Sequence, residues 1–290
     1  MGVLAIGFFD GVHLGHQAIL RGADGALTFR NHPREVLDPG RAPRLIMSVE
    51  DRIAAIEACG VGDVAVLDFT EELANMPPRM FAELLKRRLG DRLSAVRCGE
   101  NWRFGKDGAG DADFLRAAGV DVEVVPYAEY KGEKISSSRI RACLEQGELE
   151  DASAMLGRRY AIRGTRVGGK GLGRTLGFPT VNLRLQTSGP QLNLPFGVYE
   201  VEMEGCRGIA NYGLAPTMGT RAWKEPVLEV HLLYGQPSSS ASASISVSLL
   251  RFLRPERKFD SLAELRRQIA EDCDSVLNGA GPNTQTTLVG

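Results

Sequence analysis

The chain has 290 residues, 43% of them hydrophobic and 24% charged, with a formal net charge of −1 at pH 7. These proportions are ordinary for a globular protein, and the length allows two domains of about 150 residues each. The small net charge excludes a global basic field for nucleic acid or an anionic membrane, so any anionic ligand must be held by local charge. No apolar run approaches the ~20 residues of a membrane-spanning helix.

The first half alternates short apolar runs with helical patterns, an order that predicts a parallel sheet with helices on both faces. The predicted strands are 3–6, 26–29, 64–69, 93–98 and 120–125. The predicted helices between them are 16–22, 49–59, 80–89 and 111–118. Ligands of such sheets bind beyond the carboxyl ends of the strands, so a site is expected at the turn after the first strand.

That turn carries the segment GFFDGVHLGH at residues 7–16. His13 and His16 are three residues apart on the first turn of the predicted helix, so they share one face. Unpaired backbone N–H groups and the positive end of the helix dipole attract an anion there, and imidazoles can donate hydrogen bonds to phosphate oxygens. The turn therefore predicts a triphosphate site. Its other predicted phosphate-binding residues are Gly7, Phe8, Asp10 and Gly11.

This segment resembles the GxFDGxHxGH block of the HxGH nucleotidyltransferases, specifically of the FMN adenylyltransferases. GENWRFG at 99–105 is similar to the family's GENFxFG loop, with Trp102 in place of Phe. The resemblance implies a role in adenylyl transfer for Asn101 and flavin contact for Trp102 and Phe104. FRNHP at 29–33 resembles the family's TFxPHP loop, although its histidine is equally compatible with a structural role.

A further helix is predicted to begin in ISSSRIR, residues 135–141, with a serine as N-cap, and to run to residue 146. Arginine near a helix N-terminus opposes the dipole, and a bound phosphate would explain it because guanidinium binds phosphate as a bidentate donor. A solvated basic helix end is the alternative. The segment resembles the SSTxIR block of the same family, with Ser138 for Thr. The resemblance implies phosphate binding by Ser137, Ser138 and Arg139 and a catalytic role for Arg141.

The pattern changes after a short acidic helix at 148–156, and residues 164–183 read GTRVGGKGLGRTLGFPTVNL. A Walker A loop is excluded because Arg174 stands at the lysine position and Pro179 cannot lie inside the helix that should follow. The segment is instead similar to the riboflavin kinase pattern GxxxGRxLGFPTxNL. Its glycines let the backbone wrap phosphates. The resemblance implies phosphate binding by Gly169, Lys170, Gly173 and Arg174, flavin contact by Phe178, and Mg²⁺ binding by Thr180 and Asn182.

The rest of the second half predicts strands at 196–202, 207–210, 227–233 and 243–250, which favour an antiparallel barrel. A closing helix is expected from Ser261 to about Leu277, with Ser261 as cap and Glu264 at the capping-box position. Glu229 lies in the alternating segment VLEVHL; alone it is compatible with an outward-facing strand residue. In riboflavin kinases the glutamate of this segment is the base for the ribityl 5′-hydroxyl, which the resemblance implies for Glu229.

The chain departs from the family pattern in three places. GLAPT at 213–217 has Ala215 where the family commonly has arginine, and the acidic DF..GDLYG segment is replaced by a serine-rich segment at 237–248. These changes put the kinase rate in question. The chain also begins directly at its first strand. A polar tail at 279–290 is expected to be disordered.

The predicted fold is thus α/β, with a Rossmann-like HxGH nucleotidyltransferase domain at 1–156 and an antiparallel β-barrel riboflavin kinase domain with a closing helix at 157–278. The chain is identified as a member of the bacterial bifunctional riboflavin kinase/FMN adenylyltransferase (FAD synthetase) family. That membership implies phosphorylation of riboflavin to FMN and adenylylation of FMN to FAD, with ATP as co-substrate and Mg²⁺ required for both.

The expected partners are small-molecule substrates, without nucleic acid or membrane, and the protein is expected to be a monomer or weak homo-oligomer. Its five cysteines are scattered and form no Cys-x-x-Cys pair, which predicts reduced thiols in the cytoplasm. Two alternatives remain open. Another HxGH transferase, acting on pantetheine phosphate or a cytidylyl donor, would explain only the first half. A protein that binds flavin nucleotides without turnover would keep the phosphate loops.

Overall fold

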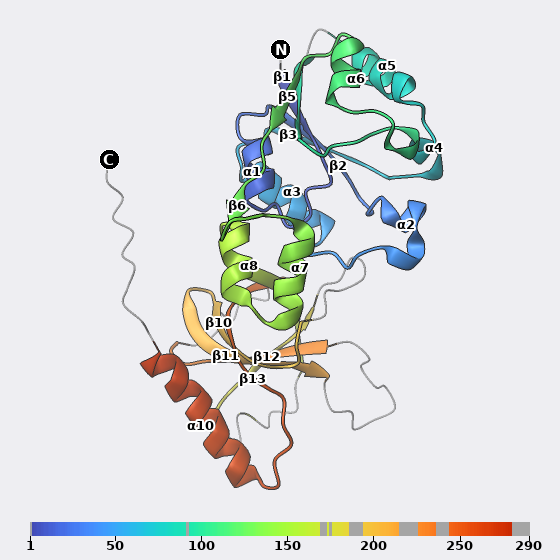
Figure 1. The fold of residues 1–290 in the computed structure, drawn as a ribbon. Coiled ribbons are helices and arrows are strands. Elements are labelled where there is room, and N and C mark those ends of the chain that lie inside the picture. The colour runs from blue at the N-terminus through green and yellow to red at the C-terminus, as the bar shows by residue number, and fades with distance from the viewer. Residues whose placement is uncertain are drawn as a thin grey trace, which may run out of the picture. The chain divides into compact units, whose positions relative to one another are not determined.

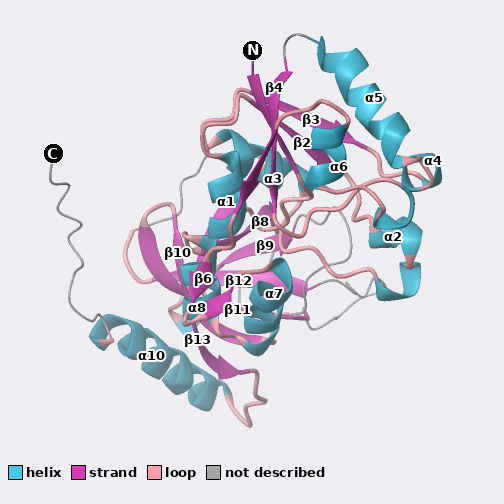
Figure 2. Ribbon diagram, turned by 45° about the horizontal axis from the view of Figure 1, so that its top comes forward, coloured by secondary structure: helices cyan, strands magenta, loops and turns pink. Residues whose placement is uncertain are grey.

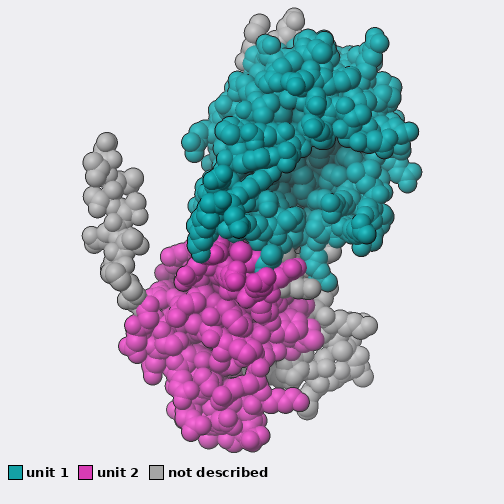
Figure 3. Space-filling view, in the orientation of Figure 1, with its two compact units in different colours: residues 1–142, 154–158, 187–192 teal, residues 143–153, 159–186, 193–290 magenta. Residues whose placement is uncertain are grey.

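The structure, a computed structural model, describes residues 2–90, 93–168, 173, 176–185, 194–214, 226–235 and 244–279. The chain divides into two compact units (Figure 3), the first built mainly from residues 1–142 and 154–158, and the second mainly from 143–153, 159–186 and 193–290. Several predicted features lie outside the described residues: Gly169, Lys170, Arg174, Ala215, residues 237–243 of the serine-rich segment, and residues 280–290 of the tail.

The first unit contains a five-stranded sheet (Figure 1). Its strands lie in the order β3-β2-β1-β4-β5. Every neighbouring pair in it is parallel, which confirms the predicted sheet. Its strands are β1 (Gly2–Ile6), β2 (Gly25–Phe29), β3 (Asp63–Leu67), β4 (Leu93–Gly99) and β5 (Val122–Val125).

Helices cover both faces of this sheet. Successive residues of β1 point to opposite sides of the sheet, and both sets of side chains are buried. Ala5 belongs to a buried cluster with Leu20 and Ile56, whereas Ile6 belongs to a separate cluster with Phe81 and others. The first cluster draws on α1 (Leu14–Leu20) and α3 (Val49–Glu57), and the second on α5 (Pro78–Leu89) and α6 (Ala112–Ala117). The sequence missed four short helices: α2 (Arg34–Leu37), η1 (Pro39–Arg41), α4 (Glu71–Ala74) and η3 (Lys106–Gly108).

A small hairpin lies just before residues 135–141, the serine–arginine segment that is predicted to bind phosphate. It consists of β6 (Glu129–Tyr130) and β7 (Glu133–Lys134), joined by Lys131 and Gly132, whose φ angles of 54° and 75° fit a type I′ turn. The sequence analysis did not predict this hairpin. Helices α7 (Ser137–Gln146) and α8 (Leu149–Leu156) follow, close to their predicted bounds.

The second unit contains a closed barrel in the order β10-β11-β12-β9-β8-β13, with every described pairing antiparallel (Figure 2). This confirms the predicted barrel. Its strands are β8 (Tyr160–Val167), β9 (Val181–Leu185), β10 (Gly197–Met203), β11 (Cys206–Leu214), β12 (Pro226–Leu232) and β13 (Ile245–Pro255). The sequence analysis did not resolve β8 and β9, which flank the glycine-dense segment.

Helix α10 (Leu262–Asn278) packs on the outside of this barrel, where Val276 and Cys273 join Val198 and Ile209 in one cluster. Ser261 caps the helix by accepting a hydrogen bond from the Glu264 N–H at 3.2 Å. The predicted capping box is wrong in one detail, because the Glu264 carboxylate accepts from the Asp260 N–H at 3.1 Å rather than from Ser261. Among the described residues, no helix has the length and apolar character needed to cross a bilayer.

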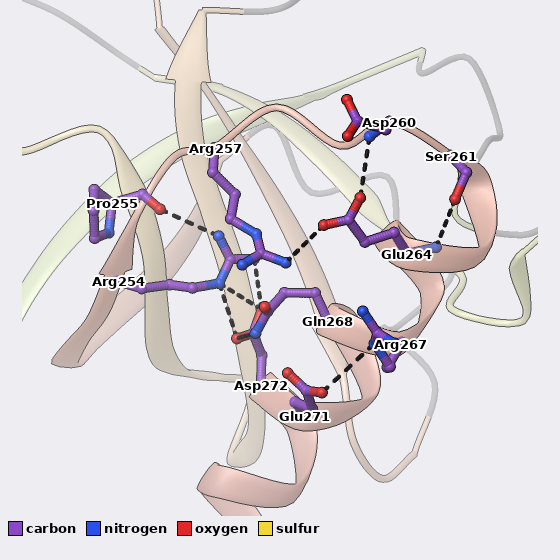
Figure 4. A network of polar contacts seen from close by, with 10 residues as sticks. All are labelled: Arg254, Pro255, Arg257, Asp260, Ser261, Glu264, Arg267, Gln268, Glu271 and Asp272. Atoms are coloured by element: carbon purple, nitrogen blue, oxygen red, sulfur yellow. Dashed lines mark hydrogen bonds and ion pairs between the residues drawn. The ribbon is translucent and has the colours of Figure 1, made fainter.

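An ion pair fixes α10 to strand β13 (Figure 4). The Arg254 guanidinium donates to both oxygens of the Asp272 carboxylate, with Nη2 2.7 Å from Oδ2, and Gln268 donates to Oδ1 at 3.1 Å. Asp272 is buried, whereas the neighbouring Glu271 forms an exposed pair with Arg267.

We expect Asp272→Ala to lower the free energy of unfolding by about 3 kcal/mol, because it leaves the Arg254 charge largely buried without its carboxylate. Glu271→Ala is the matched control on the next residue and should change it by less than about 1 kcal/mol. Urea denaturation of the full chain measures both. Equal effects of the two substitutions would contradict the assignment of the Arg254–Asp272 pair as the main polar tie of α10.

Candidate active sites

The turn after β1 holds its backbone in an unusual conformation. Phe9, Gly11 and Val12 all have positive φ, at 56°, 80° and 41°. This region is unfavourable for a β-branched residue such as Val12, so the surroundings must hold it there. A Cβ at Gly7 would lie 2.8 Å from the buried Phe9 ring, so any larger residue there would force that ring to move. Strain of this kind is often found at functional sites.

Side chains from several elements bind the carbonyl oxygens of this turn. Thr28 and Arg52 donate to Phe8, Ser137 donates to Asp10, Arg158 donates to Gly11, and Gln17 with Arg158 donates to Val12. Among the described residues, the amides of Phe8, Phe9, Asp10 and Gly11 have no hydrogen-bond acceptor. A turn with its carbonyls bound and its amides free has the character of an anion-binding nest.

The two histidines stack beside this turn. His13 is the N-cap of α1, and its ring lies 3.6 Å from the His16 ring, centroid to centroid, at an interplanar angle of 17°. The His13 Nδ1 accepts the His16 backbone N–H at 3.2 Å, so the expectation of an unpaired amide is wrong at that residue. A neutral His13 ring that accepts at Nδ1 carries its proton at Nε2 and can donate from there.

Burial lowers the pKa of His13 from 6.5 to about 4, and the charges of Lys134, Arg158 and Arg141 act in the same direction. Burial also lowers the pKa of His16 well below 6.5. Both rings are therefore neutral at pH 7, and a neutral imidazole can donate a hydrogen bond without carrying a positive charge.

These pKa values predict that acid destabilises the first unit. As the pH falls from 6.5 toward 4, the unfolded chain protonates His13 while the folded chain resists, and the stability lost for this residue reaches about 3 kcal/mol. The free energy of unfolding of a His13→Gln variant should depend less steeply on pH over this window. Urea titrations of both proteins between pH 7.5 and 5 test this. Identical pH slopes would contradict it.

Asp10 and Arg141 form a nearly buried ion pair, with Nη2 3.0 Å from Oδ2 and side-chain exposures of 1% and 12%. The Asp10 carboxylate also accepts the Ile46 N–H at 3.0 Å. Burial raises the pKa of Asp10, and Arg141 opposes that shift. The sequence predicted a bound phosphate beside Arg141, but the Asp10 carboxylate of the protein supplies part of the negative charge there. The Asp10 side chain thereby holds Arg141 in place.

The remaining residues of the serine–arginine segment differ in placement. The Ser138 hydroxyl accepts a long contact from Arg141 at 3.4 Å. Arg139 turns to the β6–β7 hairpin, where its Nη1 donates to the carbonyls of Tyr130 at 2.9 Å and Glu133 at 3.1 Å. Its main contacts thus position α7 against the hairpin.

The residues after β4 that are predicted to contact the flavin form no ring contact with His13 or His16 in the described part of the chain. The Trp102 and Phe104 rings stack at 4.8 Å, and Phe104 also packs on Phe81 at 5.0 Å. Phe104 is 8% exposed and belongs to the core, whereas Trp102 is half-buried and Asn101 is exposed. Trp102 is therefore better placed than Phe104 to contact a ligand.

The sequence analysis missed Arg52 and Arg158, the two arginines that donate hydrogen bonds to carbonyls of the turn, and of these Arg52 is buried. Arg52 is 0% exposed and donates to the carbonyls of Phe8 at 3.2 Å and Phe29 at 2.6 Å. A signal was present, because Arg52 falls on the buried stripe of α3 between Val49 and Ile56. A charged residue on an apolar stripe needs buried partners.

In the second unit, the barrel register places Glu229 on β12 opposite Asn182 on β9. Directly opposed residues have Cβ atoms about 5 Å apart. The neighbours Leu228 and Val230 are buried while Glu229 is exposed, so the predicted base and a predicted metal ligand share the outer face. Asn211 on β11 opposes Glu229 from the other side and was not predicted.

The segment before β9 lies beside this face. The Phe178 ring meets the His231 ring edge-on at 5.3 Å and is partly buried with the α10 cluster. A Cβ at Gly173 would lie 2.3 Å from the Phe178 carbonyl oxygen and 3.1 Å from Thr180 Cγ2, so glycine allows a close approach there. No group of three His, Cys, Asp or Glu residues suited to a metal occurs in the described part of the chain.

Comparison with known proteins extends over nearly the whole chain. Residues 1–139 match the family model for FAD synthetase, and residues 156–279 match that for riboflavin kinase. The bifunctional riboflavin kinase/FMN adenylyltransferases of Bacillus subtilis and Escherichia coli K12 are each 34% identical to it, over 93% of this chain and 90% of the relative. A solved Streptococcus pneumoniae structure, described as a macrolide-efflux protein, is 27% identical with a TM-score of 0.82 and covers 96% of this chain and 94% of its own.

Proposed function

The chain belongs to the bifunctional riboflavin kinase/FMN adenylyltransferase family, and on that basis we propose which of its residues carry out each reaction. It phosphorylates riboflavin with ATP to FMN, and it adenylylates FMN with ATP to FAD and pyrophosphate. In our proposal, residues 1–156 carry out adenylylation and residues 157–278 carry out phosphorylation. The observation that supports the adenylylation site best is the turn beside the stacked histidines, whose carbonyls accept hydrogen bonds and whose amides at residues 8–11 have no acceptor in the described part of the chain.

For adenylylation, a phosphate oxygen of FMN attacks the α-phosphorus of ATP in line. The bond from that phosphorus to the bridging oxygen breaks, and pyrophosphate leaves. The FMN phosphate is already ionised near pH 7, so no strong base is needed. The free amides of residues 8–11 bind phosphate oxygens, the neutral histidines donate hydrogen bonds, and Arg141, held by Asp10, offsets the charge that develops.

For phosphorylation, Glu229 accepts the proton of the ribityl 5′-hydroxyl while that oxygen attacks the γ-phosphorus of ATP and ADP leaves. Thr180 and Asn182 supply neutral oxygen atoms, which suit Mg²⁺ when substrate phosphates provide the rest of the coordination shell. Bound Mg²⁺ would neutralise phosphate charge. The cross-strand pairing of Asn182 with Glu229 supports this arrangement.

Removal of Mg²⁺ by a chelator is expected to stop both reactions, and excess Mg²⁺ should restore them. An Asn182→Ala variant should need severalfold more Mg²⁺ for half-maximal FMN formation, because it loses one proposed ligand, and should need the wild-type concentration for FAD formation from FMN. Titration of both activities with Mg²⁺ measures this. A parallel change in both activities would contradict the placement of the metal ligand.

The experiment that tests the function as a whole incubates the protein with riboflavin, ATP and Mg²⁺ and separates the flavins over time. FMN should appear first and FAD later. FAD from added FMN, without any product from riboflavin, would leave only the adenylyltransferase and would implicate the replaced serine-rich segment. Bound flavin without turnover would favour the binding protein.

We also propose that the enzyme works in the cytoplasm as a monomer or weak homo-oligomer, without nucleic acid. All five cysteines are free thiols, which suits a reducing compartment. Sedimentation of the purified chain would give its oligomeric state.

A further inference from the structure

Arg158 connects two parts of the sequence that the family models treat separately. It lies in the segment that matches riboflavin kinase, which begins at residue 156, yet it belongs to the first compact unit. Its guanidinium donates to the carbonyl of Gly11 at 2.7 Å from Nη2 and to that of Val12 at 3.0 Å from Nη1. These two carbonyls directly precede His13, the proposed catalytic N-cap of α1.

Arg158 holds the strained part of the turn. Gly11 and Val12 both have positive φ, and Val12 is the less tolerant of the two because it is β-branched. Gln17 also donates to the Val12 carbonyl, at 2.9 Å. Among the described residues, however, Arg158 is the only donor to the Gly11 carbonyl, so its loss would release that peptide group.

Arg158 also keeps its charge available. Its hydrogen-bond acceptors are neutral carbonyls, including that of Leu156 at 3.3 Å, and no carboxylate in the described part of the chain forms an ion pair with it. The neighbouring Arg159, in contrast, pairs with Glu202. The uncompensated charge of Arg158 acts on His13, whose pKa it lowers.

We propose that Arg158 is a positioning residue for FMN adenylylation: it fixes the carbonyls of Gly11 and Val12 so that the amides of the turn and His13 face the triphosphate. The proposal rests on the adenylylation site assigned above. It means that the adenylyltransferase depends on a residue from the segment that matches riboflavin kinase.

The test compares full-length Arg158→Met with Arg159→Met, a matched control one residue away. Arg158→Met keeps the apolar length of the side chain and removes the donors. We expect its kcat for FAD formation from FMN to fall at least about 30-fold, with the KM for ATP changed much less and riboflavin phosphorylation within about twofold of wild type. Arg159→Met should leave both activities within about twofold.

Arg158→Lys keeps the charge but cannot bind two carbonyls as a fork, so its rate of FAD formation should lie between those of wild type and Arg158→Met. It also serves if Arg158→Met fails to fold. Full FAD synthesis by Arg158→Lys and Arg158→Met would overturn the proposal, as would a loss of both activities in proportion to a lower melting temperature. Failure of the wild-type chain to make FAD from FMN would instead overturn the function assigned to the site.

Discussion

His16→Ala should lower the rate of FAD formation from FMN by about 10²- to 10⁴-fold and leave FMN formation from riboflavin nearly unchanged. The His16 ring stacks on His13 and meets the Phe9 ring edge-on at 5.4 Å. The substitution therefore removes a proposed hydrogen-bond donor to the phosphates. It also removes the ring that stacks on the His13 imidazole and helps to orient it. Steady-state assays started from FMN and from riboflavin measure the two reactions separately.

The control for this prediction is a variant that keeps shape and hydrogen bonding. His16→Gln retains an amide donor of similar reach, so it should recover part of the activity that His16→Ala loses. The riboflavin kinase rate of the same preparation reports whether the second unit is folded, and a urea denaturation curve of the full chain reports whether the first unit, which contains His16, is folded as in the wild type. Equal loss of both activities in His16→Ala would refute the assignment of the two reactions to separate sites.

The parts of this site that the sequence predicts are those encoded within a few residues. The spacing of His13 and His16 places them on one face, and the serines before Arg139 begin a helix, as the structure confirms through the bond from the Arg139 N–H to Ser136 Oγ. Both predictions follow from helix geometry and capping alone.

The contacts that hold the site together could not be predicted in the same way. Asp10 and Arg141 are 131 residues apart, and Arg158 and Gly11 are 147 apart. No local pattern encodes such pairs, because they depend on how distant elements pack. Arg52 is the exception, because its position on the buried stripe of α3 is visible in the sequence.

The strands that the sequence analysis did not predict were missed for local reasons. The strands of the β6–β7 hairpin are two residues long, too short to show alternation. Strands β8 and β9 border the glycine-rich segment, and they were not predicted because that segment was interpreted as a phosphate-binding motif. Their burial nevertheless alternates, since Val181 and Leu183 are buried on either side of Asn182. The placement of Glu229 and Asn182 on one face followed only when β9 was paired with β12.

Glu229→Gln is the counterpart of His16→Ala and should lower the rate of riboflavin phosphorylation by about 10²- to 10⁴-fold while FAD formation from added FMN continues. Glutamine keeps the size of the side chain and cannot accept the 5′-hydroxyl proton at neutral pH. The same two assays measure the result, with Mg²⁺ and ATP held in excess.

The matched control is Glu256→Gln. Glu256 accepts a hydrogen bond from Asn211 at 3.1 Å, and Asn211 is also the cross-strand neighbour of Glu229, so both carboxylates lie near one residue of the barrel. A glutamine at 256 can still accept from Asn211 through its amide oxygen and should have a much smaller effect. If both substitutions lowered the kinase rate equally, local charge rather than proton transfer to Glu229 would explain the loss. If neither did, the base would have to be another group, and the outward orientation of Glu229 would be only that of an exposed strand residue.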